Sequence, residues 1–486
     1  MSQTKLIGEA EKSSPRRGTG PPNRINDLTY TEWMRFQKSF FWYESDQKLI
    51  DELIPFFTKA RYPDGHVSRS LIVGFDSYEP ERTKPPRIID HARPDTDIAT
   101  IATELQHARE SGEYDFAFVD MRRALTRQEP DRKALTSCDS LFSSLRKLVK
   151  ADRYCGMLAR IEKPTDFPTP WSVALVGRAH LRLRDEKIAL FHDSDTTYYC
   201  LFFQSNDDER PPSHLTRAEL QLTSRPHAIP PWTTPKPPPR RKGELLHPAK
   251  FPETLVKQFI DLFTHAGDTV FDPMVGTGST VLAALRSGRG GIGIDLIPKF
   301  LEIAKNRILN EFPSSLLESD AIPAYKLIEG DATKLSEIAP VQGTQVDYCI
   351  TSPPYWSVLG NRGSEYQRSR RQRGLPLVYS EEKSDIGNVQ DYDAFLRILV
   401  DTYDQVARLL KPGGYLTVVV KNLKRKHVVY PLSWDLMARL ARIGGHYEYV
   451  GTTLWCQDDI SVKPFALGTH WVSNTLHHYC LHFRRL

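Results

Sequence analysis

A proline-rich stretch near the middle of the chain limits how its 486 residues can fold. Seven prolines lie between positions 226 and 239, and three basic residues follow them. Because proline lacks an N–H donor and fixes φ, this stretch can form neither a helix nor a central strand. We therefore predict an extended linker over residues 226–242, which joins an N-terminal α/β domain, residues 27–225, to a C-terminal domain, residues 243–486.

The composition is that of an ordinary soluble protein, with 40% hydrophobic and 26% charged residues. No window approaches the ~18 apolar residues that a membrane span needs, so we expect no membrane contact. Residues 1–26 have no apolar core, and we expect a disordered tail there instead of a secretory signal. The six cysteines form no Cys-x-x-Cys pair, which argues against a metal site and a disulfide framework and favours a reducing cytoplasm.

Strand and helix signals alternate along the C-terminal domain. In chain order, the pattern predicts a helix over 255–263, a strand over 269–271, a helix over 279–286, a strand over 292–294, a helix from Pro298, a strand over 346–350, a helix over 391–410 and a strand over 415–420. The glycine-rich stretch 288–293 is predicted as a turn. This alternation is typical of an α/β fold with a mainly parallel sheet and helices on both faces, and ligands then bind at the carboxyl ends of the strands.

Three acidic residues follow predicted strands of this domain. Asp272 precedes the glycine loop Gly276-Thr277-Gly278, Asp295 ends the next strand, and Asp331 lies further along the chain. A glycine loop at a helix N-terminus lets a ligand approach the backbone, and an acid at the end of the second strand can accept hydrogen bonds from a ribose. We therefore predict a site for a nucleoside-type cofactor; the alternative for the glycine loop alone is a tight turn.

A second feature, Thr351-Ser352-Pro353-Pro354-Tyr355-Trp356, directly follows a predicted strand. Its two prolines have no N–H groups, so the segment offers mainly acceptors: the Ser352 hydroxyl and the carbonyls of Ser352 and Pro353. A rigid, acceptor-rich corner beside aromatic rings suits a planar base that carries an exocyclic amine. The alternative is a proline-stiffened loop with two core aromatics.

Together these motifs resemble those of the amino-group DNA methyltransferases, which use S-adenosylmethionine. The resemblance rests on the glycine loop followed by the Ser-Pro-Pro-Tyr-Trp corner and covers about residues 243–486. Three flanking segments also resemble the family: 247–253, 409–414 and 477–483. The resemblance implies an α/β fold with a Rossmann-like methyltransferase sheet.

The resemblance also implies roles for single residues. Asp272, Gly276, Thr277 and Gly278 would hold the methionine part of the cofactor, Asp295 the ribose and Asp331 the adenine edge.

On the substrate side, Ser352 and the Pro353 carbonyl would accept hydrogen bonds from the target amine, Pro354 would stiffen the corner, and Tyr355 would stack on a flipped base. Serine at 352, where many adenine enzymes carry aspartate, favours cytosine N4. Adenine N6 and RNA are the alternatives within this enzyme class. Carbon-5 methylation needs a thiolate nucleophile, and we expect Cys349 to be a core residue instead.

The resemblance and the charge pattern imply double-stranded DNA as the partner. Four arginines in the segment 361–374 are candidate DNA contacts: Arg368, Arg370, Arg371 and Arg373. A cognate restriction endonuclease is a further candidate partner, and the cytoplasm, near the nucleoid, is the expected location. The oligomeric state, monomer or dimer, stays open.

The N-terminal half contains three segments that match the C-terminal half in the same order. Residues 49–60 match 255–266, residues 114–120 match 346–352, and residues 197–203 match 477–483. We predict a degenerate, non-catalytic copy of the same fold that helps to recognise DNA; chance similarity is the alternative. An inactive methyltransferase-like binding module and a nuclease fusion are the alternatives from other function classes.

Overall fold

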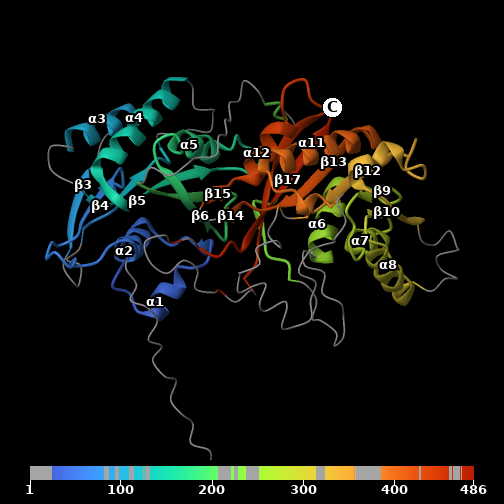
Figure 1. Cartoon of the computed structure of the whole chain (residues 1–486), viewed down its shortest axis with the longest axis horizontal. Helices are drawn as coiled ribbons and strands as arrows, with labels where there is room; N and C mark the ends of the chain where they lie inside the picture. The colour runs from blue at the N-terminus through green and yellow to red at the C-terminus, as the bar shows by residue number, and fades with distance from the viewer. Residues whose placement is uncertain are drawn as a thin grey trace, which may run out of the picture.

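The computed structural model describes a set of segments that covers most of both halves: residues 25–80, 87–92, 98–108, 114–123, 125, 132–205, 220–223, 228–236, 251–312, 323–354, 356, 385–425, 428–458, 462, 471 and 473–486. Two large sheets lie side by side, one from each half of the chain (Figure 1). Within these segments no helix combines the length and the apolar character that crossing a bilayer requires.

The C-terminal sheet has the strand order β11-β10-β9-β12-β13-β17-β16-β8. Its strands are β8 (Trp232–Thr233), β9 (Thr269–Asp272), β10 (Gly290–Asp295), β11 (Tyr325–Glu329), β12 (Val346–Thr351), β13 (Leu410–Val420), β16 (Tyr447–Cys456) and β17 (His477–Arg485). All neighbouring pairs are parallel except the two that involve β17. A Rossmann-like sheet, as predicted, is thus confirmed.

Helices cover both faces of this sheet. They are α6 (Glu253–Phe263), α7 (Ser279–Arg286), α8 (Pro298–Glu311), α11 (Tyr392–Leu409) and α12 (Leu432–Leu440); two 3-10 turns, η3 (Ala332–Glu337) and η4 (Ile386–Asn388), and a small hairpin, β14 (Leu423–Arg425) with β15 (Val428–Tyr430), complete the half. Residues of α6 share one buried cluster with Tyr348 and Ile350. Residues of α11 and α12 share another with Cys349 and Leu416. Because side chains alternate along a strand, these clusters lie on opposite faces.

The N-terminal sheet has the strand order β1-β6-β7-β5-β4-β2-β3, and only β7 runs antiparallel to its neighbours. Its strands are β1 (Phe40–Trp42), β2 (Arg69–Val73), β3 (Ile88–Ala92), β4 (Tyr114–Asp120), β5 (Val149–Ile161), β6 (Arg182–Leu190) and β7 (Thr197–Gln204). The helices are α1 (Tyr30–Arg35), α2 (Asp46–Phe57), α3 (Ile98–Ala108), α4 (Arg132–Leu148) and α5 (Thr169–Gly177).

The two sheets have the same topology when β1, β2, β3, β4, β5, β6 and β7 are set against β8, β9, β10, β12, β13, β16 and β17. The three sequence matches fall on equivalent elements: α2 on α6, β4 on β12, and β7 on β17. Register irregularities also recur, between β4 and β5 as between β12 and β13, and between β6 and β7 as between β16 and β17. Within the described segments, the N-terminal half has no counterpart of α7 or β11.

Single hydrogen bonds recur at these equivalent positions. Asp115 and Asp347 each accept the N–H of the first residue of the neighbouring strand, at 3.0 and 2.9 Å. Each of these carboxylates also meets a lysine, Lys150 or Lys411. The two halves therefore agree in single contacts as well as in topology.

A second recurring arrangement ties the end of a helix to the start of a strand. It links α2 to β3 in the N-terminal half and α6 to β10 in the C-terminal half. The hydroxyls of Thr58 and Thr264 each accept the Nε–H of an arginine, Arg87 at 3.0 Å and Arg289 at 3.1 Å. The backbone agrees as well, because Asp152, with φ of 59°, occupies the position of Gly413, with φ of 81°.

Two sequence expectations need correction in the C-terminal half. The predicted turn over 288–293 ends early, because Gly290 already begins β10. The strand predicted from Tyr415 begins at Leu410, since β13 pairs with Val346 across a register shift that takes up Pro412. In the predicted linker, the described residues 228–236 include β8, which pairs with β16.

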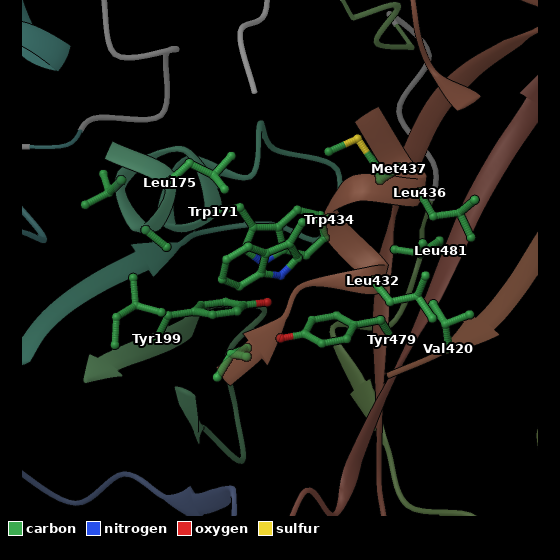
Figure 2. Close-up of a cluster of buried hydrophobic side chains, with 14 of the residues drawn as sticks. Trp171, Leu175, Tyr199, Val420, Leu432, Trp434, Leu436, Met437, Tyr479 and Leu481 are labelled. Atoms are coloured by element: carbon green, nitrogen blue, oxygen red, sulfur yellow. The ribbon is translucent and has the colours of Figure 1, made fainter. Parts of the chain in front are cut away.

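The halves meet through equivalent elements. Figure 2 shows Trp171 of α5 and Trp434 of α12 together at the centre of the contact. Tyr199 of β7 and Tyr479 of β17 point their hydroxyls toward each other from opposite sides. All four side chains are fully buried or nearly so, so the two halves share a continuous core.

Candidate active site

The glycine loop lies between β9 and α7, as predicted. Gly276 and Gly278 adopt φ of 53° and 81°, the left-handed region that favours glycine. A Cβ on Gly278 would lie 2.6 Å from the Cβ of Ala304, so this glycine also allows α8 to pack closely. The loop therefore places the first turn of α7 at the carboxyl end of β9.

Asp272 accepts hydrogen bonds from both ends of this loop. Its side chain is buried, accepts the hydroxyl of Thr280 at 2.6 Å and accepts the N–H of Met274 at 3.0 Å. Burial raises the pKa of Asp272 to about 6. The carboxylate is thus turned into its own loop, and its predicted role toward the cofactor stays a prediction.

Asp295 ends β10 beside the loop, where it was predicted to bind a ribose. Its carboxylate accepts the N–H of Gly276 at 2.8 Å and the N–H of Ile297 at 2.9 Å, and it remains partly exposed. Burial, with a smaller effect from the charge of Asp385, raises its pKa. Each oxygen retains a lone pair, so the carboxylate can still accept hydrogen bonds from a ligand.

Asp331 follows β11, the strand beyond β10. Its side chain is partly exposed and accepts the N–H of Thr333 at 2.9 Å at the start of η3. The parallel order β11-β10-β9 brings Asp331, Asp295 and the glycine loop to one edge of the sheet.

A partly buried ion cluster beside the glycine loop was not predicted from the sequence. Glu253, the first residue of α6, pairs with Arg286 of α7 and with Arg307 of α8. Arg307 also donates to the carbonyl of Thr277. Asp385, which accepts the N–H of Gly387 at 2.8 Å, was not predicted either. Glu253 ends the segment 247–253 that resembles the family, but its ion pairs with α7 and α8 join distant parts of the chain.

The predicted catalytic corner begins where β12 ends, on the strand next to β9. Ser352 and Pro354 are partly exposed, whereas Pro353 is buried. Trp356 is buried, and its ring packs against Tyr430 at 4.8 Å and Tyr392 at 5.2 Å between centroids. The corner therefore lies at the same edge as the glycine loop.

Two groups of predicted site residues fall outside the described residues. These are Tyr355 and the four arginines Arg368, Arg370, Arg371 and Arg373. Their assignments stay predictions.

Cys349 lies inside β12 and is fully buried, and burial raises the pKa of its thiol well above the usual value. A thiolate nucleophile is disfavoured at this position, in line with its expected place in the core.

The positions of the N-terminal half that are equivalent to the glycine loop carry bulky, buried side chains. Ile72 stands in the position of Asp272, and the fully buried Phe75 and Tyr78 follow β2 where the other half has its glycine loop. After β4, Arg122 pairs with Asp46 at 2.8 Å and with Asp120 at 2.6 Å.

Comparison with known proteins relates part of this chain to DNA methylases. A family model described as DNA methylase matches residues 153–306, from β5 through the linker and the glycine loop to α8. The chain is 38% identical over 91 residues to the Type II methyltransferase M.BglI of Bacillus subtilis. That match covers 19% of this chain and 26% of the relative. It is 39% identical over 71 residues to the Type II methyltransferase M.HpaI of Haemophilus parainfluenzae, 15% of this chain and 23% of that protein.

The chain has the predicted resemblance to the amino-group DNA methyltransferases, which these matches confirm. It spans about a quarter of the length of these curated relatives. The family match includes β5, β6 and β7 of the N-terminal half and ends before the corner at Ser352.

S-adenosylmethionine is the cofactor of this family, and the residues present fit it. The Ser279 hydroxyl, at the first position of α7, is buried and has no hydrogen-bond partner within the described segments. A buried hydroxyl without a partner is costly, and a ligand in the glycine loop would supply one. With Asp295 and Asp331 on the adjoining strands, this edge offers acceptors for a nucleoside.

Proposed function

We propose that this protein transfers a methyl group from S-adenosylmethionine to the exocyclic N4 amine of cytosine in double-stranded DNA, as the modification enzyme of a restriction–modification or host-protection system. One observation carries the proposal. The acceptor-rich corner at Ser352 and the glycine loop with Asp295 emerge from neighbouring parallel strands at one edge of the sheet.

The bound cofactor supplies an activated methyl group, so the protein's task is to orient the amine. The lone pair of an aryl amine is delocalised into its ring, which makes the nitrogen a poor nucleophile. The Ser352 hydroxyl and the Pro353 carbonyl would accept hydrogen bonds from the two amine hydrogens and favour a pyramidal nitrogen with its lone pair free. Pro353 and Pro354 have no N–H groups that could compete for that lone pair.

The corner also has a rigid support. Trp356 packs against Tyr430 and Tyr392, and Tyr392 donates to Asp435 at 2.7 Å. A fixed corner reduces the ordering that the reaction requires, whereas a flipped base costs a few kcal/mol to extrude. Stacking on Tyr355 would offset part of that cost.

Serine at position 352 favours cytosine over adenine as the target, and adenine N6 is the second candidate. DNA contacts would come from the arginines 368, 370, 371 and 373 and from the N-terminal half, which we propose acts in recognition without catalysing transfer. A restriction endonuclease is the expected partner in the cell.

The test is a methyl-transfer assay with unmethylated genomic DNA and isotopically labelled cofactor, followed by digestion and mass analysis of the nucleosides. We expect labelled N4-methylcytosine. Labelled N6-methyladenine would refute the base assignment and leave the enzyme class intact. No labelled nucleoside, from protein that binds the cofactor, would refute the proposed activity.

A further inference from the structure

Asn422 lies two residues beyond the carboxyl end of β13, the strand next to β12. Register pairs Thr351 with Val418, so the segment after Val420 runs beside the catalytic corner. The Asn422 side chain is buried. Its Oδ1 accepts the N–H of Ser433 at 3.1 Å and the Ser433 hydroxyl at 2.6 Å.

This contact replaces a missing helix cap. The N-cap of α12 is Pro431, which provides no side-chain cap. The N–H groups of the first turn of a helix have no partner within the helix, so Asn422 supplies an acceptor that α12 lacks. The start of α12 is thereby tied to the end of β13.

The other side of Asn422 faces the N-terminal half. Its Nδ2 donates to Oε1 of Glu186, in β6, at 2.7 Å. Glu186 is 3% exposed. Next to it, Asp185 pairs with Lys424 and accepts the N–H of Ser473. Two buried acids of one half therefore bind the segment that follows β13 in the other half.

The equivalent positions on the opposite side of the interface lack this network. The register places Ile161 at the position of Asn422 and Thr452 at that of Glu186. Pro170 stands in place of Ser433, at the same point of the equivalent helix α5, and has no N–H to cap. Among the described residues, the network is thus built only toward the half that carries the Ser352 corner.

Residues at the start of α12 contact the residues that support the Ser352 corner. Tyr430 immediately precedes Pro431, and its ring lies 4.8 Å from that of Trp356. Asp435 of α12 accepts the hydroxyl of Tyr392, which also contacts Trp356. Contacts therefore run from Glu186 through Asn422 and the first turn of α12 to Trp356.

We propose that Glu186 of the N-terminal half is a positioning residue for methyl transfer, which fixes Asn422 and thereby the support of the Ser352 corner. The inference rests on the proposed function of that corner. It gives the N-terminal half a role in catalysis that is separate from DNA recognition.

The test compares Asn422→Asp, Glu186→Gln and the double variant in the complete chain, with kcat and the KM for the cofactor measured separately. Asn422→Asp sets two buried carboxylates against each other, and we expect kcat to fall about 30-fold while the KM for the cofactor stays within about threefold. Glu186→Gln keeps an acceptor for Asn422 and should stay within about threefold of the wild type. In the double variant the introduced glutamine amide can donate to the introduced aspartate, which still accepts from Ser433, so kcat should recover to within about fivefold.

Glu186→Thr serves as a second test without a buried charge pair, since threonine, the residue at position 452, is too short to reach Asn422. It should lower kcat about as much as Asn422→Asp. The matched control is Tyr154→Phe, which removes a different hydrogen bond between the halves, from the Trp471 N–H at 2.9 Å, and should leave kcat unchanged.

Thermal unfolding of each variant identifies those that fail to fold. Glu186→Thr with wild-type kcat would overturn the inference, as would a double variant no more active than a folded Asn422→Asp protein. A wild-type protein that transfers no methyl group would instead refute the proposed function itself.

Discussion

Trp171 of the N-terminal half stacks on Trp434 of the C-terminal half, with ring centroids 5.6 Å apart and ring planes 21° from parallel. The two residues occupy the same position in equivalent helices, each of which follows an N-cap proline with nearly the same φ and ψ. Contact between equivalent surfaces is the rule in symmetric dimers. Here it occurs within one chain, so the two halves form a fused dimer-like unit.

Trp171→Ala and Trp434→Ala should each lower the free energy of unfolding by about 3–5 kcal/mol, because each removes a fully buried indole. The double variant should lose less than the sum, since the two rings contact each other. Urea denaturation followed by circular dichroism measures all three. Strict additivity would contradict the stacked arrangement.

Ser352→Ala should reduce methyl transfer by about 100-fold and leave cofactor affinity unchanged, because it removes one acceptor for the amine outside the glycine loop. Single-turnover assays and calorimetric titration with the cofactor give the two quantities. Ser194→Ala, an exposed serine in the N-terminal half, is the control. Equal loss of binding and turnover would place Ser352 in the cofactor site instead.

Asp295→Ala should weaken cofactor binding by about 100-fold, since it removes a ligand acceptor and also the partner of the Gly276 N–H. Asp261→Ala, on an exposed part of α6, controls for the loss of a carboxylate. Affinity is measured by titration calorimetry on protein whose folding has been checked by its thermal transition. An unchanged dissociation constant would rule out the assignment of Asp295.

One cofactor molecule should bind per chain, although the chain contains two related sheets. The buried Phe75 and Tyr78 stand at the chain positions of the glycine loop in the N-terminal half, and Ile72 stands at that of Asp272. Calorimetric stoichiometry tests this expectation. Two equivalent sites per chain would show that these aromatics do not close the second site.

Asp272 should make stability depend on pH. Burial raises its pKa to about 6, so the folded protein holds this proton more tightly than the unfolded chain does. This contribution is fully present below about pH 4 and is lost as the pH rises through 6, a change of about 3 kcal/mol. Asp272→Asn stays neutral, so its stability relative to the wild type should rise by that amount between pH 4 and 7 in denaturation experiments. A constant difference would show that Asp272 has an ordinary pKa.

Local signals allowed much of the C-terminal half to be predicted. Helix α7 ends at Arg286 as expected, Pro298 begins α8, and Asp391 caps α11 and accepts the N–H of Ala394 at 2.7 Å. The three acids also lie at one edge, because parallel strands fix where their ends meet.

Contacts between distant parts of the chain could not be predicted. Glu186 and Asn422 lie 236 residues apart, and no local pattern pairs a strand residue of one half with a loop of the other. The ion cluster around Glu253 was missed for the same reason. The buried Asp272 accepts the hydroxyl of Thr280, in the first turn of α7, and no sequence motif reveals this contact.

The strand β8 has a practical consequence for dissecting the molecule. Two segments before residue 243 pair with β16. The Thr223 N–H donates to the Tyr449 carbonyl and the Tyr449 N–H donates to the Gln221 carbonyl, while Trp232 of β8 pairs with Leu454. A shortened protein that starts at residue 243 would lack these segments, so the backbone N–H and C=O groups at this edge of β16 would have no partner. Such an exposed edge strand promotes aggregation with other chains. A shortened protein that starts before residue 220 would keep residues 221–223 and β8 paired with β16.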